Sequence, residues 1–215
     1  MTLSTFGLVR RTFPQLGFAA YVAEMRKQLA GCRTCLDIGC GPASPVRFLD
    51  FDTTVGIDGH EPTLALARAN RTHTEFQLCD VTTIDTRFSK GQFECCVALD
   101  VIEHLSKEDG IALIGAMQKI ASKKILLFTP NGYLPQQSHD GDLQAHLSGW
   151  EPEEMRRVGF TVIGMHGFKF LRGEYHEHRF KPRALSGIVS LISHFLFTRS
   201  HPEHASALVC VKSVR

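Results

Sequence analysis

Long apolar runs, tryptophan and an excess of charge of either sign are all scarce in this chain of 215 residues. Its most apolar stretch, residues 184–197, is interrupted by serine, glycine and histidine, so no segment is expected to cross a bilayer. Residues 1–14 have no long apolar core, so we expect no targeting peptide. The net charge is only +2, and basic residues interleaved with aromatic ones are not evident, so we expect no nucleic-acid partner.

The cysteine pattern does not suggest a disulfide framework or a metal site. The chain has 7 cysteines, an odd number, and most of them fall in or beside apolar segments that read as buried strands. Cys32 and Cys35 form a Cys-x-x-Cys pair, but no second ligand pair is visible in the sequence. We therefore expect reduced core thiols in a cytoplasmic protein. Hydrophobic residues make up 43% of the chain, which is typical of one packed domain spanning residues 1–215.

The most informative motif is the segment 35–44, Cys-Leu-Asp-Ile-Gly-Cys-Gly-Pro-Ala-Ser. It reads as an apolar strand followed by a glycine turn, since Gly39 and Gly41 permit a sharp bend and a close approach by a ligand. Ser44 and Pro45 then predict the start of a helix. Strand, glycine turn and helix in this order indicate a nucleotide-binding corner.

Two details argue against a dinucleotide at this corner. The third glycine of the dinucleotide fingerprint is replaced by Ser44. Asp37, at the mouth of the turn, would repel a pyrophosphate and suits a ligand that carries a positive charge. An NAD(P)-dependent oxidoreductase is therefore the alternative rather than the first interpretation.

Acidic residues also follow the next three predicted strands. The strand 53–58 ends in Asp58, about 20 residues past the glycine turn, where Rossmann-like folds place an acid that binds ribose. The strand 75–78 is followed by Asp80 and Val81. The strand 93–99 is followed by Asp100, Glu103 and His104. Strands that alternate with helices predict a parallel α/β sheet, whose ligands bind beyond the carboxyl ends of the strands.

Taken in order over residues 35–105, these motifs resemble those of class I S-adenosylmethionine-dependent methyltransferases. The resemblance implies a Rossmann-like, mostly parallel seven-stranded sheet with helices on both faces and a final antiparallel strand, for which residues 207–214 fit. It also implies that S-adenosylmethionine is the cofactor and S-adenosylhomocysteine the product, and that Asp80 meets adenine. The residues expected to bind the donor are Asp37, Gly39, Cys40, Gly41, Asp58, Gly59, Asp80, Val81 and Asp100.

A methyl acceptor with a hydroxyl group needs a base, and two histidines are candidates. His104 follows the fourth strand, beside the expected point of methyl transfer, and His146 is the second candidate. In the alternative, Asp100, Glu103, His104 and His146 hold a divalent metal, as the resemblance to ubiquinone-biosynthesis and small-RNA methyltransferases suggests. The first expectation is a site without metal.

The remaining segments are assigned to the acceptor side. Residues 1–31 read as an N-terminal helical lid, and residues 131–149 and 167–203 as insertions at the acceptor site. We expect O-methylation of a small molecule, with an apolar acceptor or a membrane-surface contact as the alternative uses of residues 184–197. A non-catalytic sensor or partner subunit that binds the donor is the remaining alternative. The sequence does not indicate an oligomeric state.

Overall fold

The computed structural model of the chain describes residues 5–135, 145–171, 180–181 and 183–214, and gives the backbone alone for residues 5–15 and 183–184. Parts of both predicted acceptor insertions, residues 136–144, 172–179 and 182, lie outside the described residues. No helix in the described part of the chain is long and apolar enough to span a membrane.

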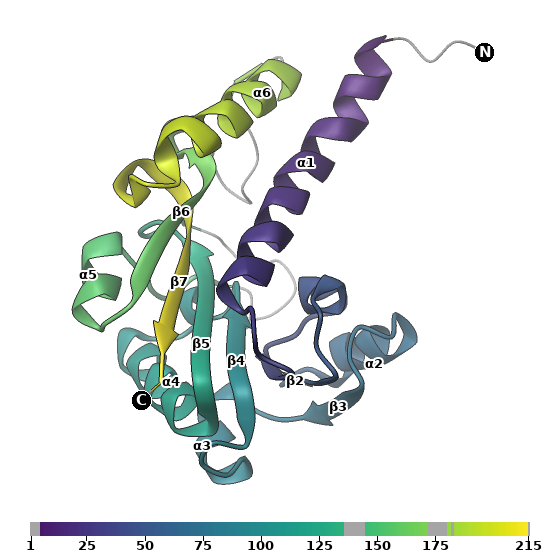
Figure 1. Cartoon of the computed structure of the whole chain (residues 1–215), viewed down its shortest axis with the longest axis vertical. Helices are drawn as coiled ribbons and strands as arrows, with labels where there is room; N and C mark the ends of the chain where they lie inside the picture. Colours follow the sequence, from purple (N-terminus) through teal and green to yellow (C-terminus); the bar gives the residue numbers. More distant parts are fainter. Residues whose placement is uncertain (1–4, 136–144, 172–179, 182, 215) are drawn as a thin grey trace.

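A single seven-stranded sheet organises the molecule, in the order β3-β2-β1-β4-β5-β7-β6 (Figure 1). All neighbouring strands run parallel except β7, which is antiparallel to both β5 and β6. The predicted fold class and the predicted final antiparallel strand are thereby confirmed. The strands are β1 (Thr34–Ile38), β2 (Thr53–Asp58), β3 (Glu75–Leu78), β4 (Phe93–Leu99), β5 (Ala121–Pro130), β6 (Thr161–Phe168) and β7 (Ala205–Ser213).

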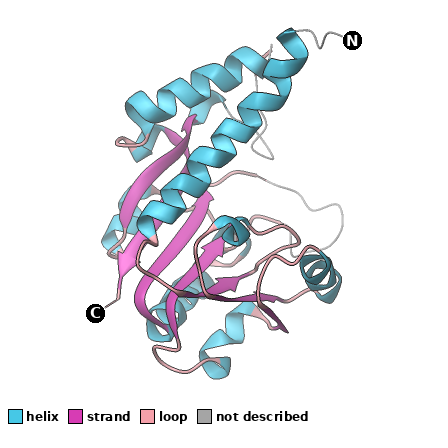
Figure 2. Ribbon diagram, turned by 45° about the vertical axis from the view of Figure 1, so that its right-hand side comes forward, coloured by secondary structure: helices cyan, strands magenta, loops and turns pink. Residues whose placement is uncertain are grey.

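Helices cover both faces of this sheet (Figure 2). Ser106 caps the start of α4, since its hydroxyl oxygen accepts a hydrogen bond from the backbone N–H of Asp109. Gly31, with φ of +82°, follows the end of α1 as the sequence predicts. The helices are α1 (Thr5–Gln28), α2 (Glu61–Ala69), α3 (Ile84–Arg87), α4 (Lys107–Ile120), α5 (Pro152–Arg157) and α6 (Arg183–Ser193), which continues into a π-helical turn, His194–Thr198.

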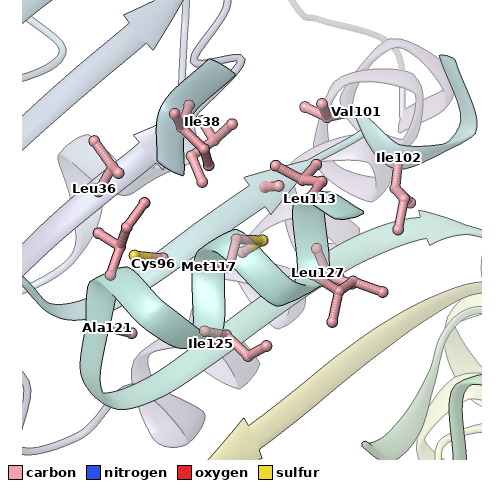
Figure 3. Packing of buried hydrophobic residues seen from close by; sticks show 14 of the residues in the cluster. Leu36, Ile38, Cys96, Val101, Ile102, Leu113, Met117, Ala121, Ile125 and Leu127 are labelled. Carbon is pink, nitrogen blue, oxygen red and sulfur yellow. The ribbon is translucent and has the colours of Figure 1, made fainter. Parts of the chain in front are cut away.

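Strand alternation distributes the apolar residues between two cores, one on each face. On β4, Cys96 belongs to the core that α4 covers, whereas Cys95 belongs to the core that α1 covers. Figure 3 shows Met117 of α4 over Ile125 and Leu127 of β5 in the first core. All seven cysteines are buried and free, so the expectation of reduced core thiols agrees with the fold.

The helix predicted after Ser44 is absent from the structure. Ser44 does act as a cap, because its Oγ accepts a hydrogen bond from the N–H of Val46 at 3.1 Å, but the element that follows is one 3-10 turn, Pro45–Phe48. Only eight residues separate Ser44 from β2, too few for several helical turns and the return of the chain. The donor corner is therefore a glycine turn without a long helix behind it.

Candidate active site

The carboxyl ends of β1 and β4 bring the first and the fourth sequence motif together. The two strands are parallel neighbours, at the point where the strand order reverses. A Cβ atom added to Gly39, in the turn after β1, would lie 2.6 Å from Cγ2 of Val101, in the loop after β4. The two loops are thus in direct contact, and Gly39 is required for that contact.

The glycine turn itself is held by β2. The backbone N–H of Cys40 donates to the carbonyl of Ile57 at 2.9 Å, and that of Gly41 donates to Oδ2 of Asp58 at 3.1 Å. Gly39 and Gly41 have φ of +65° and +57°, in the left-handed region that favours glycine. No heavy atom would meet a Cβ atom at Gly41, so this side of the turn faces open space.

Asp37 lies beneath the turn rather than at its mouth. Its side chain is buried, and Oδ2 accepts hydrogen bonds from Oγ of Ser44 at 2.5 Å and from Nε2 of His73 at 2.9 Å. His73, which the sequence motifs did not indicate, is in turn contacted through Nδ1 by the hydroxyl of Thr72 at 2.9 Å. This network supports the turn from below, and a direct contact between Asp37 and the donor stays a prediction.

The adenosine side of the predicted site lies at the ends of β2 and β3. Asp58 also accepts a hydrogen bond at Oδ1 from the N–H of His60 at 2.9 Å. Oδ1 of Asp80 accepts bonds from the N–H and the hydroxyl of Thr82 at 2.9 and 2.8 Å, and the Asp80 side chain is exposed. Val81 packs against the core beside it, and Gly59 is exposed. These residues lie at the expected edge of the sheet, and their contacts with adenosine stay predictions.

Asp100 occupies a strained position at the end of β4. Its φ is +54°, an uncommon conformation for a residue with a side chain, and its N–H donates to the carbonyl of Phe128 at 2.9 Å. Backbone strain of this kind is concentrated at functional sites. Desolvation by the surrounding protein raises the pKa of the Asp100 carboxyl. Because solvent still reaches this residue, the shift is expected to be smaller than at buried Glu103.

Glu103, His104 and His146 form the most unusual cluster in the described part of the chain. Their potential ligand atoms all lie within 4.8 Å of one another. The Glu103 side chain is buried, Oε2 accepts a hydrogen bond from the hydroxyl of Thr129 at 3.1 Å, and Oε1 has no partner among the described residues. Burial raises the pKa of Glu103 well above its ordinary value, and the Asp100 charge raises it further.

Backbone carbonyls fix the state of both imidazoles. Nδ1 of His104 lies 3.1 Å from the carbonyl of Ala145, and Nδ1 of His146 lies 2.7 Å from that of Leu134. Because a carbonyl only accepts, Nδ1 carries the proton in each ring and Nε2 keeps a free lone pair. Burial lowers the pKa of both histidines, so both are neutral at pH 7. Because its pKa is raised, the Glu103 carboxyl favours its protonated form, whose O–H can donate a hydrogen bond to an imidazole lone pair.

The segment that carries His146 is anchored to the loop after β4. The carbonyl of Glu103 accepts hydrogen bonds from the N–H groups of Leu147 and Ser148 at 2.8 and 3.0 Å. Trp150 is fully buried, and its Nε1 donates to Oγ of Ser148 at 2.9 Å and to the carbonyl of Ile102 at 3.3 Å. Trp150 thus packs in the core and holds this segment in place.

A cavity of about 530 Å³ lies next to the cluster. Leu134, whose carbonyl binds His146, lines this cavity together with Tyr133, whose hydroxyl donates to the carbonyl of His146 at 3.3 Å. Phe168 and Phe170 line it from the end of β6. A larger cavity of about 720 Å³, lined by Lys124 and residues near the end of the chain, is at the amino end of β5. Because ligands of such sheets bind at the carboxyl ends of the strands, we assign the acceptor side to the smaller cavity.

Comparisons with known proteins agree with this geometry. Residues 36–124 match the protein family described as "Methyltransferase domain". No curated protein sequence matches the chain. A solved SAM-dependent methyltransferase from Archaeoglobus fulgidus is 14% identical, with a TM-score of 0.60, and the match covers 98% of this chain and 100% of that one.

Two further structures have the same fold. The methyltransferase domain of the bacterial protein CtHen1 is 16% identical with a TM-score of 0.58, over 94% of this chain and 100% of the other. The magnesium protoporphyrin IX methyltransferase from Synechocystis PCC 6803, crystallised with S-adenosylhomocysteine, is 15% identical with a TM-score of 0.54, over 100% and 90% of the two chains. Residues 36–124 thus match a methyltransferase-domain family, and the chain has the fold of these methyltransferases; both findings support S-adenosylmethionine-dependent methyl transfer.

Proposed function

We propose that the protein transfers the methyl group of S-adenosylmethionine to an oxygen atom of a small-molecule acceptor. The observation that carries the choice of oxygen is the cluster of Glu103, His104 and His146, with two free Nε2 lone pairs and an unpartnered carboxylate oxygen. A hydroxyl nucleophile must lose a proton, and this cluster can accept one. Two of its members, Glu103 and His104, lie just after Val101 in the chain, and Val101 contacts the proposed donor turn.

On the donor side, the chain has only to position a methyl group that the sulfonium already activates. In this proposal Asp58 binds the ribose, Asp80 and Val81 contact adenine, and the amino-acid tail occupies the open side of Gly41. As the acceptor oxygen attacks, its bond to the methyl carbon forms, the carbon–sulfur bond breaks, and S-adenosylhomocysteine leaves as a neutral thioether. Alignment of this kind is worth about 7–11 kcal/mol.

The proton is proposed to go to an imidazole. Nε2 of His104 is our first candidate and Nε2 of His146 the second, because the carbonyls of Ala145 and Leu134 hold their other nitrogens protonated. An imidazolium beside Glu103 would favour the carboxylate form of Glu103, which would in turn stabilise the imidazolium. The aromatic lining of the 530 Å³ cavity favours an acceptor with an apolar body.

A second candidate is the same reaction assisted by a divalent metal. Glu103, His104 and His146 offer one carboxylate and two imidazoles within 4.8 Å, a set that suits manganese, iron, cobalt or zinc better than magnesium. Asp100, which the sequence alternative also included, is not in this group. A bound ion would lower the pKa of an acceptor hydroxyl.

Three measurements test these proposals. Calorimetry should show binding of S-adenosylhomocysteine and none of NADH; the reverse result would favour the oxidoreductase alternative. Transfer of radiolabelled methyl groups to extracted small molecules tests turnover. Good donor binding without any transfer of label would favour a donor sensor or partner subunit. In the product of the same assay, the chemical shift of a ¹³C-labelled methyl group distinguishes attachment to oxygen from attachment to nitrogen or carbon. Activity that survives exhaustive chelation, with no metal retained on the protein, would remove the metal candidate.

A further inference from the structure

Helix α6 and the π-helical turn after it have an inverted polarity. Their small polar residues are buried, whereas their large apolar residues face outward, with Leu196 80% and Phe195 62% exposed. An ordinary surface helix does the opposite. The buried set is Ser186, Ser190, Ser193, His194 and Thr198, and the exposed set is Leu185, Val189, Ile192, Phe195, Leu196 and Phe197.

Close packing against β6 fixes this orientation. A Cβ atom added to Gly164 would lie 1.9 Å from the carbonyl oxygen of Thr198, and one added to Gly167 would lie 2.2 Å from that of Ser190. The hydroxyl of Ser190 donates to the carbonyl of His166 at 2.5 Å. The side of α6 that packs on β6 has room only for small side chains. Rotating the helix to bury its leucines and phenylalanines would therefore cause clashes.

The outward face is continuous with other exposed apolar groups. Phe197 contacts Phe168, with ring centroids 5.9 Å apart, and Phe168 stacks on the exposed Phe170 at 5.3 Å. Phe168 and Phe170 also line the cavity beside His146. Helix α1 lies next to α6 (Figure 2). Exposed apolar surface on this scale marks an interaction site.

The charged residues within this segment are of one sign. Residues 178–202 contain no aspartate or glutamate, but they contain Arg179, Lys181, Arg183 and Arg199. Arg199 is paired with Glu24 of α1 through two hydrogen bonds of 3.0 and 3.1 Å. The other three cations cluster at the start of α6 in the sequence. A second copy of the chain would bring like charges together, whereas an anionic lipid surface would neutralise them.

We propose that the outward face of α6, Leu185 to Phe197, docks on the surface of a bilayer that contains anionic lipids. The apolar side chains enter the boundary between headgroups and acyl chains, and the exposed Lys181, just before the helix, meets the lipid phosphates. The helix lies on the membrane and does not cross it, since the α6 segment is too short to span the hydrocarbon core.

Sedimentation with lipid vesicles tests this proposal on the full chain. Vesicles of phosphatidylcholine with phosphatidylglycerol should bind the protein, vesicles of phosphatidylcholine alone should bind it less, and added salt should reduce the difference. The double variant F195S/L196S should bind the anionic vesicles roughly tenfold to a hundredfold less tightly. The matched control L66S/I111S, which changes exposed apolar residues on α2 and α4, should bind as the wild type does.

Several results would overturn the proposal. These are failure of the wild type to bind either kind of vesicle, equal loss in both double variants, and a concentration-dependent dimer that F195S/L196S abolishes while no vesicle binds. Calorimetry with S-adenosylhomocysteine checks that each variant remains folded. Because vesicle binding does not require methyl transfer, its outcome is independent of the function proposed above.

Discussion

At the scale of single residues, Glu103 is the side chain whose surroundings are hardest to explain by stability alone. It is buried beside the lone pairs of two neutral imidazoles, and Oε1 lacks a partner in the described part of the chain. A buried carboxylate in this state is costly to stability. Such a cost is typical of functional sites.

We therefore predict that Glu103→Gln lowers kcat by about 10²–10⁴-fold. The amide keeps the size of the side chain and can accept the hydrogen bond from Thr129, but it neither stabilises an imidazolium nor binds a cation. Steady-state kinetics with a labelled donor measures the change, and donor affinity should remain that of the wild type. The control is Glu108→Gln, at an exposed position on α4. Full turnover in Glu103→Gln would mean that Glu103 takes no part in the reaction.

Gly39 and Gly41 have similar φ angles, but the space beside Gly39 is filled and the space beside Gly41 is open. The two glycines therefore form a matched pair for substitution. An added methyl group meets Val101 at Gly39 and nothing at Gly41. We predict that Gly39→Ala destabilises the fold by about 1–3 kcal/mol more than Gly41→Ala does. Denaturant unfolding measures the difference, and adding Val101→Ala to Gly39→Ala should recover part of it.

Gly41→Ala should instead act on the donor. Its methyl group would enter the open space where we place the amino-acid tail, so affinity for S-adenosylhomocysteine should fall at least tenfold with little additional loss of stability. Calorimetry measures the affinity. Donor binding unchanged from the wild type would move the tail away from this turn.

The position of several candidate site residues was predictable from the sequence, because each lies at or just after the end of a predicted strand. Asp58 and Asp100 follow strands whose apolar patterns fix their ends, so both reach the carboxyl edge of the sheet. The burial of Asp37 was not predictable, since it depends on His73, which lies far along the chain and reaches Asp37 over Gly56. The absence of a side chain at Gly56 was the one sequence signal for this contact.

At the scale of elements, the same distinction between local and distant causes applies. The bounds of β2, β3 and β4 agree with the sequence prediction, because apolar residues in β2 and β4, and polar–apolar alternation in β3, are followed by turn residues. The missing helix after Ser44 could have been anticipated from the short connection to β2. The outward face of α6 could not, because the close approach of Gly164 and Gly167 on β6 decides it.

The π-helical turn after α6 buries a histidine that should make stability depend on pH. Burial lowers the pKa of His194, and the Arg199 cation lowers it further, so the ring is neutral in the folded protein. Below about pH 6.5 the unfolded chain takes up a proton that the folded chain does not, and stability falls as the pH falls.

We predict that His194→Gln reduces this dependence. Thermal unfolding followed between about pH 8 and 5 should show a shallower loss of stability for the variant than for the wild type. Glutamine does not titrate in this range, so the difference between the two slopes isolates His194 from the other histidines. Parallel slopes would mean that His194 is protonated in the folded protein.

At the scale of the whole molecule, the proposed donor would join the ends of β1, β2, β3 and β4, which are separated by loops. A ligand that binds only the folded state stabilises it in proportion to its affinity. Because the two sheet faces have separate cores, occupancy at this shared edge should raise the stability of the entire sheet.

We predict that S-adenosylhomocysteine at about 100 times its Kd raises the free energy of unfolding by about 2.7 kcal/mol. For a chain of this size the melting temperature should rise by several degrees. Scanning calorimetry measures the shift, with NADH as the comparison that should produce none. Asp58→Ala should weaken the effect at a fixed ligand concentration. A shift with NADH instead would contradict the donor assignment.

The burial of Cys40 between the two turn glycines has a practical consequence. Its thiol is shielded and burial raises its pKa, so an alkylating reagent cannot modify it while the turn is closed. The rate of its alkylation is therefore a measure of how often the turn opens. A bound donor should slow that rate, so the rate reports occupancy in a chain whose other thiols are also enclosed.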